Sequence, residues 1–476
     1  MTGRRPLFGP GDRALLLRLL RIPTVAPLET GPGPGPGPGP GPGPGPGPGP
    51  GPGPGHDRRW PATVGPGRCR RDGLRRAQRA YARAARAAGF KVVHHAAPPE
   101  DVLHRADVPA VVRRRAAADP GFLARQPGLV LRLGPDLPRV PTVMFNVHLD
   151  TVAGAEPVGF DGTRFTGRGA IDAKGPAVAL LAGVRAARAA CRDLGRRVAV
   201  LVQAVGGEEG GAMGVYGTRP LIEAGFTGRL NVFCEPTGLR WLPRATASMT
   251  ARITVRGEDA VDDRPEHGHN ASVVLGFLAQ HLAAALDGRT ADGRVCVAGL
   301  HTGHLHNRVY GQGSLLLNLS YATAWQGAAL ERAVTEALAD GLRAFTQRFA
   351  DSAHFARTAA DAAAVTRLEW DKRGLPCLAA GSDPWAESLL HAAGAPRWPD
   401  DEPAFTCDAI WADGLPDAST VVLGPGRLDD NRAHAAGEFA DLADLEAFAD
   451  VVARLLTVFA ARSARSARSA DRGSAV

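Results

Sequence analysis

Residues 141–175 read PTVMFNVHLDTVAGAEPVGFDGTRFTGRGAIDAKG, and the rest of the chain is organised around this stretch. The apolar residues 143–147 predict a buried strand that ends where His148 and Asp150 begin. Asp172 follows later in the same stretch. In open α/β sheets the sites lie beyond the carboxyl ends of the strands. The stretch therefore predicts that a histidine and two aspartates meet where such folds keep their chemistry.

His148 and Asp150 have a spacing that suits a metal ligand and its supporting carboxylate. On an extended backbone residues i and i+2 point the same way, so Asp150 can hold the second ring nitrogen of His148 and fix its tautomer. A neutral imidazole and a carboxylate are ligand types that suit zinc. A solvated loop edge could carry the same two residues, so the pair alone does not decide between the two interpretations.

Three further apolar stretches are followed by histidine or carboxylate side chains. Glu208 and Glu209 follow residues 197–204, Glu235 follows residues 229–233, and His434 comes after residues 419–423. Carboxylates gathered at one sheet edge would repel one another without a cation between them. Two histidines and three carboxylates suit a pair of zinc-like ions that share a carboxylate, and the spare glutamate could act as a base in hydrolysis. Taken singly, each residue could equally be an exposed charged loop residue.

The order of predicted elements indicates an α/β fold with a three-layer α/β/α main domain. Residues 1–244 and 376–460 form its two parts, and residues 245–375 predict an inserted α+β domain of ferredoxin-like type. Residues 31–55 alternate Gly and Pro, which predicts an extended, mobile insertion within the first part. The Ala-Arg-Ser repeats at 461–470 predict that residues 461–476 form a disordered tail.

Composition narrows the possible partners and the compartment. The chain has 476 residues and a formal net charge of +8, with much of the excess in arginine-rich segments. Because no clustered aromatics interleave these arginines, we interpret them as solvated surface rather than a nucleic-acid site. No membrane span or signal peptide is expected. Six cysteines without a Cys-x-x-Cys pair predict reduced thiols in the cytoplasm.

Five motifs occur in a characteristic order. They are HLDTV at 148–152, GRGAIDAKG at 167–175, GGEEGG at 206–211, CEPTG at 234–238 and GPG…AH at 424–434. Over nearly the whole chain outside residues 31–55 and the tail, the sequence resembles the zinc aminoacylase and carboxypeptidase family. Members of this family include acetylornithine deacetylase, succinyl-diaminopimelate desuccinylase and glutamate carboxypeptidase. The Asp-Ala-Lys-Gly form of the second motif also resembles deacylases that release lysine or ornithine from an amino-group carrier protein.

The resemblance implies a role for each motif residue. His148 and Glu235 would bind one metal ion, Glu209 and His434 would bind the other, and Asp172 would bridge them before a cis peptide to Ala173. Glu208 would be the general base, and Asp150 would orient His148. The cofactors would be two divalent cations, zinc with cobalt as the alternative.

The inserted domain would be the family's lid and dimerisation domain, and residues 265–271 match its Pro-x-x-Gly-x-Asn-Ala pattern. Asn307 matches a lid residue that contacts substrate. The family's lid histidine is missing, because positions 260 and 261 hold alanine and valine. His267 and His269 are candidate substitutes, or ordinary residues at a helix start. The family's carboxylate-binding arginine is replaced by Asn-Leu-Ser-Tyr at 318–321, which predicts altered substrate recognition.

The resemblance thus implies a metal-dependent amidohydrolase that cleaves an N-acyl amino acid or a small peptide-like amide, free or bound to a carrier protein. It implies a cytoplasmic homodimer formed through the lid, without nucleic-acid or membrane partners. Two alternatives stay open. The chain could be an amino- or carboxypeptidase of the same family, or a catalytically weak metal-binding scaffold.

Overall fold

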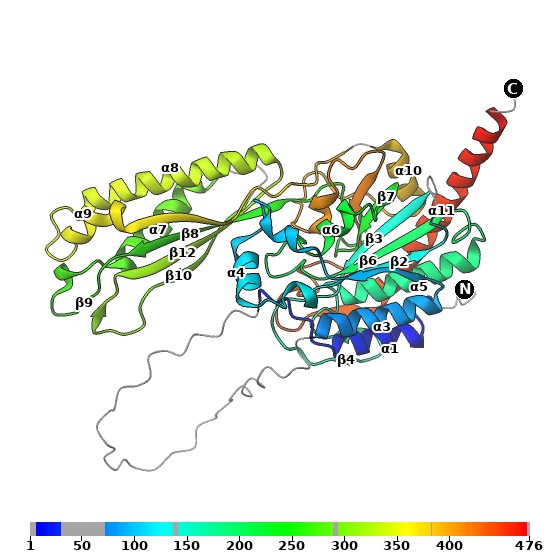
Figure 1. The fold of residues 1–476 in the computed structure, drawn as a ribbon, viewed down its shortest axis with the longest axis horizontal. Helices are drawn as coiled ribbons and strands as arrows, with labels where there is room; N and C mark the ends of the chain where they lie inside the picture. Colours follow the sequence, from blue (N-terminus) through cyan, green and yellow to red (C-terminus); the bar gives the residue numbers. More distant parts are fainter. Residues whose placement is uncertain (1–5, 30–71, 137–140, 289–293, 382, 474–476) are drawn as a thin grey trace, which may run out of the picture.

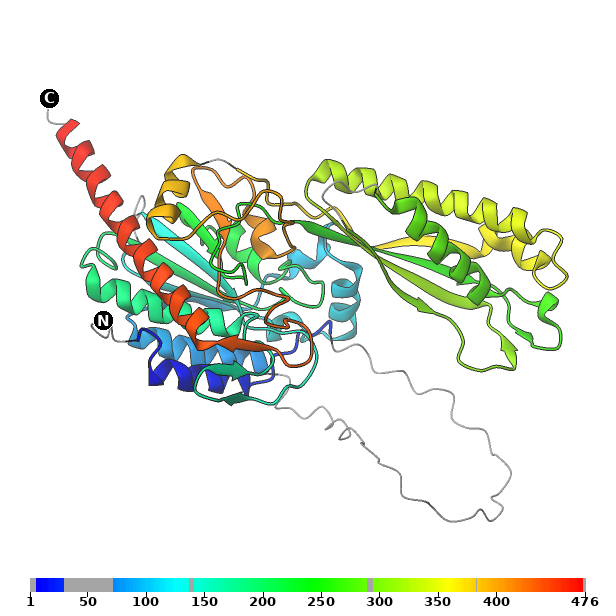
Figure 2. The ribbon, with the colours of Figure 1, turned by 180° about the vertical axis from the view of Figure 1, so that it is seen from behind.

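The computed structural model describes residues 6–29, 72–136, 141–288, 294–381 and 383–473, with side chains described up to residue 464. The predicted Gly-Pro insertion at 31–55 lies outside the described residues. Figures 1 and 2 show a larger domain and a smaller one that extends from one side of it.

A six-stranded sheet forms the centre of the larger domain, in the order β1-β2-β6-β3-β7-β14. The strands are β1 (Lys91–Ala96), β2 (Gly128–Leu133), β3 (Thr142–His148), β6 (Ala199–Val205), β7 (Leu230–Phe233) and β14 (Ser419–Val422). The strands β6, β3, β7 and β14 run parallel to one another, whereas β2 is antiparallel to both β1 and β6. Four parallel carboxyl ends therefore lie side by side.

Both faces of this sheet are covered, which explains the continuous apolar runs of its central strands. In β3, Val143, Phe145 and Val147 belong to one hydrophobic cluster and Met144 to the other, as the alternation of a strand requires. The first cluster includes residues of α1 (Pro10–Leu20), α3 (Gly73–Ala87), α5 (Lys174–Ala190), α10 (Pro384–Ala392) and α11 (Leu442–Gly473). The second includes residues of α4 (Ala110–Ala118), α6 (Thr218–Glu223) and the 3-10 helix η4 (Asp408–Ala412).

The helices α5 and α11 pack closely, and Gly183 allows this approach. A Cβ atom at Gly183 would lie 2.5 Å from the carbonyl oxygen of Ala449 and 2.7 Å from Cβ of Val452. Since α5 begins at Lys174, two residues after Asp172, this contact anchors the loop that carries Asp172 to the core. A small three-stranded sheet of β15 (Phe439–Asp441), β5 (Arg164–Thr166) and β4 (Gly159–Phe160) borders the same loop.

The smaller domain has the ferredoxin-like order of elements. Its main elements are β8 (Ala247–Arg256), α7 (Ala271–Leu286), β10 (Arg294–His301), β12 (Gln312–Tyr321), α8 (Ala324–Phe349) and β13 (Thr366–Lys372). The four strands form an antiparallel sheet in the order β10-β12-β8-β13. Further short elements are β9 (Ala260–Val261), β11 (Arg308–Val309) and α9 (Ala356–Val365). The predicted fold class, an α/β/α domain with an inserted α+β domain, is confirmed.

The C-terminal segment differs from the sequence-based expectation. The sequence predicts a disordered tail from residue 461, whereas α11 continues as a helix to Gly473. Alanine and arginine are both strong helix formers, so the Ala-Arg-Ser repeats extend a helix that the core has already nucleated. Figure 1 shows this end of α11 projecting away from the domain.

Two further observations bear on the expectations from composition. Within the described part of the chain, no helix is both long and apolar enough to cross a membrane. The described cysteines are free thiols: Cys191, Cys234, Cys296, Cys377 and Cys407.

Candidate metal centre

The candidate ligands lie at the carboxyl edge of the larger sheet. His148 is the last residue of β3, Glu209 lies in the loop after β6, Glu235 follows β7, and His434 lies in the loop after β14. Because β6, β3, β7 and β14 are parallel neighbours, their following loops converge on one place. Asp172 reaches the same place from the segment just before α5.

Asp172 lies between the two histidines. Its Oδ1 is 2.8 Å from Nε2 of His148, and its Oδ2 is 3.0 Å from Nε2 of His434. Nε2 of His148 is also 3.7 Å from Oε2 of Glu235, and Nε2 of His434 is 3.1 Å from Oε1 of Glu209. His148 therefore lies beside Glu235, His434 lies beside Glu209, and both histidines lie beside Asp172.

These residues form two overlapping groups whose potential ligand atoms lie within 4.8 Å of one another. One group is His148, Asp172 and Glu235, and the other is Asp172, Glu209 and His434. A third group combines His148 with Glu208 and Glu209, so Glu208 lies at the same centre. The peptide bond between Asp172 and Ala173 is cis, as the resemblance implies.

Burial makes the negative charges of Glu208 and Glu209 unfavourable, whereas at Asp172 burial is outweighed by hydrogen bonds from His148 and His434, which lower its pKa. Burial raises the pKa of Glu209 to about 7, and the charge of Asp172 adds to this effect. Burial also raises the pKa of Glu208 well above its usual value. The imidazole of His434, whose side chain is 53% exposed, has its pKa raised to about 10 by hydrogen bonds to Asp172 and Glu209. A set of imidazole nitrogens and carboxylates in which positive charge is favoured fits divalent cations.

Asp150 holds both the ring of His148 and the glutamate loop. Nδ1 of His148 lies 3.1 Å from the backbone carbonyl oxygen of Asp150 and 3.6 Å from its Oδ1. Oδ2 of Asp150 accepts hydrogen bonds from the backbone N–H groups of Gly207 (2.8 Å) and Glu209 (3.2 Å). Gly207 has φ +83°, a conformation that favours glycine, so the loop folds back onto Asp150 at this residue. The sequence predicts that the carboxylate of Asp150 contacts His148, whereas the backbone carbonyl oxygen is the nearer atom. The sequence does not predict the hydrogen bonds from Gly207 and Glu209 to this carboxylate.

Sequence reasoning also missed a buried ion pair that connects two ligand loops. Nη1 of Arg168 donates to Oε2 of Glu438 at 2.7 Å, and Nη2 of Arg168 donates to the carbonyl oxygen of Ala435 at 3.0 Å. Oε1 of Glu438 accepts from the backbone N–H groups of Ile171 (3.1 Å) and Asp172 (3.3 Å). Arg168 stands in the second motif, but nothing in the sequence identifies Glu438 as its partner.

The predicted substrate-binding residues of the lid do not join this cluster. Asn307 and His267 are exposed, and the side chain of His267 is 60% accessible. His269 is buried: its Nδ1 accepts from the backbone N–H of Glu258 at 2.9 Å, and its Nε2 lies 3.1 Å from Oδ2 of Asp361. These contacts favour the structural interpretation of His269. Strand β9, beside this region, lies at the far end of the smaller domain from the large sheet (Figure 1).

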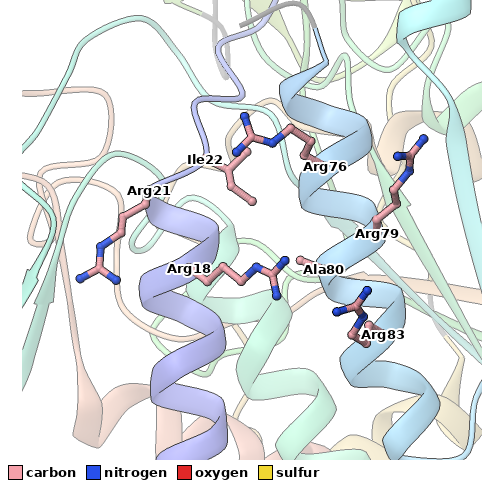
Figure 3. A pocket seen from close by; sticks show the side chains of 7 residues that line it. All are labelled: Arg18, Arg21, Ile22, Arg76, Arg79, Ala80 and Arg83. Atoms are coloured by element: carbon pink, nitrogen blue, oxygen red, sulfur yellow. The ribbon is translucent and has the colours of Figure 1, made fainter. Parts of the chain in front are cut away.

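A separate cavity of about 370 Å³ lies between α1 and α3 and contains none of the cluster residues. Its lining consists of Arg18, Arg21, Ile22, Arg76, Arg79, Ala80 and Arg83 (Figure 3). Figure 3 shows Arg18 of α1 reaching toward α3, whereas Arg21 points away from it. The residues that line this cavity include five arginines and no aromatic side chain.

The larger domain is an α/β/α domain with a histidine–carboxylate cluster at its carboxyl edge and a ferredoxin-like insertion, and the donor atoms of this cluster could hold metal ions. The model of peptidase family M20/M25/M40 matches residues 144–458, and the chain belongs to this family. The resemblance drawn from the five motifs is thereby confirmed.

Individual relatives agree with this membership. The chain is 31% identical over 193 residues to a putative [LysW]-lysine/[LysW]-ornithine hydrolase of Aeropyrum pernix, a match that spans 40% of this chain and half of that relative. An M20 family metallo-carboxypeptidase of Sulfolobus solfataricus superposes with a TM-score of 0.62 at 12% identity, over 95% of this chain and all of that one. A dinuclear metal-binding M20 peptidase of Bacillus subtilis gives 0.52 at 12% identity, over 80% and 91%. At these identities the two structures show a shared fold.

Proposed function

We propose that the chain is a metal-dependent amidohydrolase that cleaves the amide bond of an N-acyl amino acid or a small peptide-like substrate. One observation carries this proposal: the two oxygens of Asp172 face two different histidines. Glu235 and Glu209 supplement one histidine each, and Glu208 lies beside them. Family membership supports the same reaction class.

Two divalent cations would be held at this centre, zinc with cobalt as the alternative. His148 and Glu235 would hold one, Glu209 and His434 the other, and Asp172 would contact both. The donor atoms fit, because imidazole nitrogens and carboxylate oxygens are ligands that zinc accepts. Cations bound there would polarise the acyl oxygen and make water more acidic.

Glu208 acts as the general base in this proposal. It takes a proton from the water whose oxygen forms a bond to the acyl carbon. As the C–N bond breaks, Glu208 delivers that proton to the leaving amine. Burial raises the pKa of Glu208, which makes its carboxylate a better acceptor for the proton of the water. Asp150 keeps Glu208 in place by binding the backbone N–H groups on either side of it, at Gly207 and Glu209.

The name of the Aeropyrum relative supports a substrate whose released amine is lysine or ornithine, free or attached to a carrier protein. The Asp-Ala-Lys-Gly sequence at 172–175 supports the same choice. We further propose a cytoplasmic homodimer formed through the lid. Strand β10 is an edge strand of the lid sheet and exposes the apolar Val297 (38%) and Leu300 (46%), a surface suited to a second copy. Light scattering in solution tests this assembly.

Turnover of a substrate panel tests the proposed function. The panel holds N-acyl amino acids, dipeptides with a free amino terminus and peptides with a free carboxyl terminus, each with added zinc or cobalt. Release of an amino acid from N-acyl substrates is the expected result. Preferential cleavage of dipeptides or of C-terminal residues would favour the peptidase alternatives. Two bound cations without any turnover would favour a scaffold.

A further inference from the structure

Lys372 is a buried cation at the junction of the two domains that the proposed mechanism does not use. It is the last residue of β13, and only 7% of it is exposed. Its Nζ donates a hydrogen bond to Oγ of Ser248 at 2.7 Å. Among the described residues, no carboxylate forms an ion pair with Nζ of Lys372. A buried ammonium with one neutral partner is costly unless another group completes its hydrogen bonding.

A bulge in β13 directs Lys372 toward the larger domain. Trp370 pairs with Ala251 of β8 and Lys372 pairs with Thr250, so Asp371 is the extra residue between them. Without this extra residue Lys372 would pair with Met249, whose side chain lies in the core beneath α7 and α8. With it, Lys372 shares the opposite face of the sheet with Ser248.

That face looks onto the loop that carries the glutamates. A Cβ atom at Gly211 would lie 3.9 Å from Nζ of Lys372, and Gly211 stands two residues after Glu209. Burial lowers the pKa of Lys372 to about 8, and the charge of Glu208 opposes this decrease. The side chain is therefore still mainly protonated at pH 7. Asp371, the nearest acid in sequence, is engaged by Arg252 and Arg114 instead.

We propose that Nζ of Lys372 binds a carboxylate of the substrate, and so makes the enzyme selective for amides that carry a free carboxylate near the scissile bond. This inference rests on the proposed function. Ser248 positions the ammonium, and the absence of a side chain at Gly211 leaves room beside it.

The main competing role for Lys372 is a purely electrostatic one toward Glu208. In that role the lysine would alter proton transfer for every substrate alike. In the proposed role it discriminates between ligands that differ only in a carboxylate. The two roles are separated by measuring binding rather than turnover.

The experiment compares Nα-acetyl-L-lysine with Nα-acetyl-L-lysinamide by calorimetry, using the zinc-loaded full chain with Glu208→Gln to prevent turnover. We expect the carboxylate to bind more tightly than the amide by about 10- to 100-fold, the range for a hydrogen bond to a charged group. Adding Lys372→Met should remove this preference, and adding Lys372→Arg should retain part of it. Arg367→Met, at the other end of β13, should leave the preference unchanged and serves as the charge-matched control.

Three results would overturn the inference. The first is that the Glu208→Gln protein binds the carboxylate and the amide equally tightly. The second is that it still prefers the carboxylate after Lys372→Met is added. The third is that Lys372→Met weakens the binding of both ligands by the same factor. If Lys372→Met does not fold, Lys372→Gln keeps a donor for Ser248 and gives the same comparison. If the wild-type chain hydrolyses no amide but Lys372 still controls the preference, the proposed function fails while the binding site stands.

Discussion

Replacing Glu438 by alanine should weaken cation binding at the centre, although Glu438 is not one of the proposed ligands. Its carboxylate accepts two backbone hydrogen bonds, from Ile171 and Asp172, and one from the buried guanidinium of Arg168. Arg168 in turn binds the carbonyl oxygen of Ala435, next to His434. Glu438 therefore fixes the distance between the two loops that carry Asp172 and His434.

The expected magnitude follows from these contacts. Removing one partner of a buried ion pair typically destabilises a protein by about 3–5 kcal/mol when the other charge is left without a partner. Arg168 would keep Glu156, whose Oε1 lies 3.7 Å from its Nη2, so the loss of stability should lie at or below the lower end of this range. Losing a residue that orients metal ligands typically lowers metal affinity by about 10- to 100-fold. Glu438→Ala should show both effects. Glu438→Gln keeps the acceptor for Ile171 and Asp172, so its loss of affinity should be smaller.

The assay is zinc competition against a chromophoric chelator, combined with urea denaturation of the same preparations. Glu336→Ala, which removes an exposed carboxylate from α8, is the matched control and should match the wild type in both measurements. A folded Glu438→Ala protein with wild-type zinc affinity would refute the claim that this residue positions the ligand loops.

Three further predictions test separate parts of the account. Glu208→Gln should lower kcat by about 10²- to 10⁴-fold, the usual contribution of a positioned base, and leave the metal content unchanged. Glu209→Gln should instead lower the metal content. If Glu208→Gln loses metal and Glu209→Gln keeps it, the roles of the two residues are exchanged. Burial raises the pKa of Asp383, but hydrogen bonds from Arg229 and Ser419 outweigh the effect of burial and hold this pKa at about 2. Because this value is lower than in the unfolded chain, Asp383 stabilises the fold above about pH 4 and loses this effect toward pH 2. Asp383→Asn should therefore lower the free energy of unfolding by about 2 kcal/mol at pH 7 and by little near pH 2, as denaturation across that range will show. Deleting residues 31–55 should leave turnover unchanged, and a folded deletion variant without activity would place that segment at the site.

The parts of the centre that the sequence predicts are those that follow from strand order. An apolar run that ends in His148 predicts both a buried strand and the location of its last residue. The same reasoning applied to Glu235 and Glu209 brings them to the same edge, because parallel neighbouring strands end together. The same reasoning also includes Asp172 and the distant His434, but only the family resemblance assigns each of them to a particular metal ion, because their approach depends on loops that no periodicity describes.

The parts that the sequence does not predict depend on tertiary contacts between distant segments. Glu438 and Arg168 are far apart in the chain and form a pair only after both loops have folded. Lys372 faces the larger domain because β13 contains one extra residue, and the sequence of this strand does not reveal the position of the bulge. Both ring nitrogens of His269 have partners within the lid, which favours the interpretation of His269 as a structural residue at a helix start; the sequence left this interpretation open. The C-terminal helix shows the opposite case, in which local helix propensity outweighed a low-complexity composition.

The most direct test of the central claim is a crystal structure of the zinc-loaded protein with anomalous data collected at the zinc edge. The account predicts two peaks about 3.5–4 Å apart, with one oxygen of Asp172 on each. His148 and Glu235 should bind one ion, and His434 and Glu209 the other. A single ion, or two ions of which only one contacts Asp172, would contradict the assignment of a shared carboxylate on which the proposed function rests.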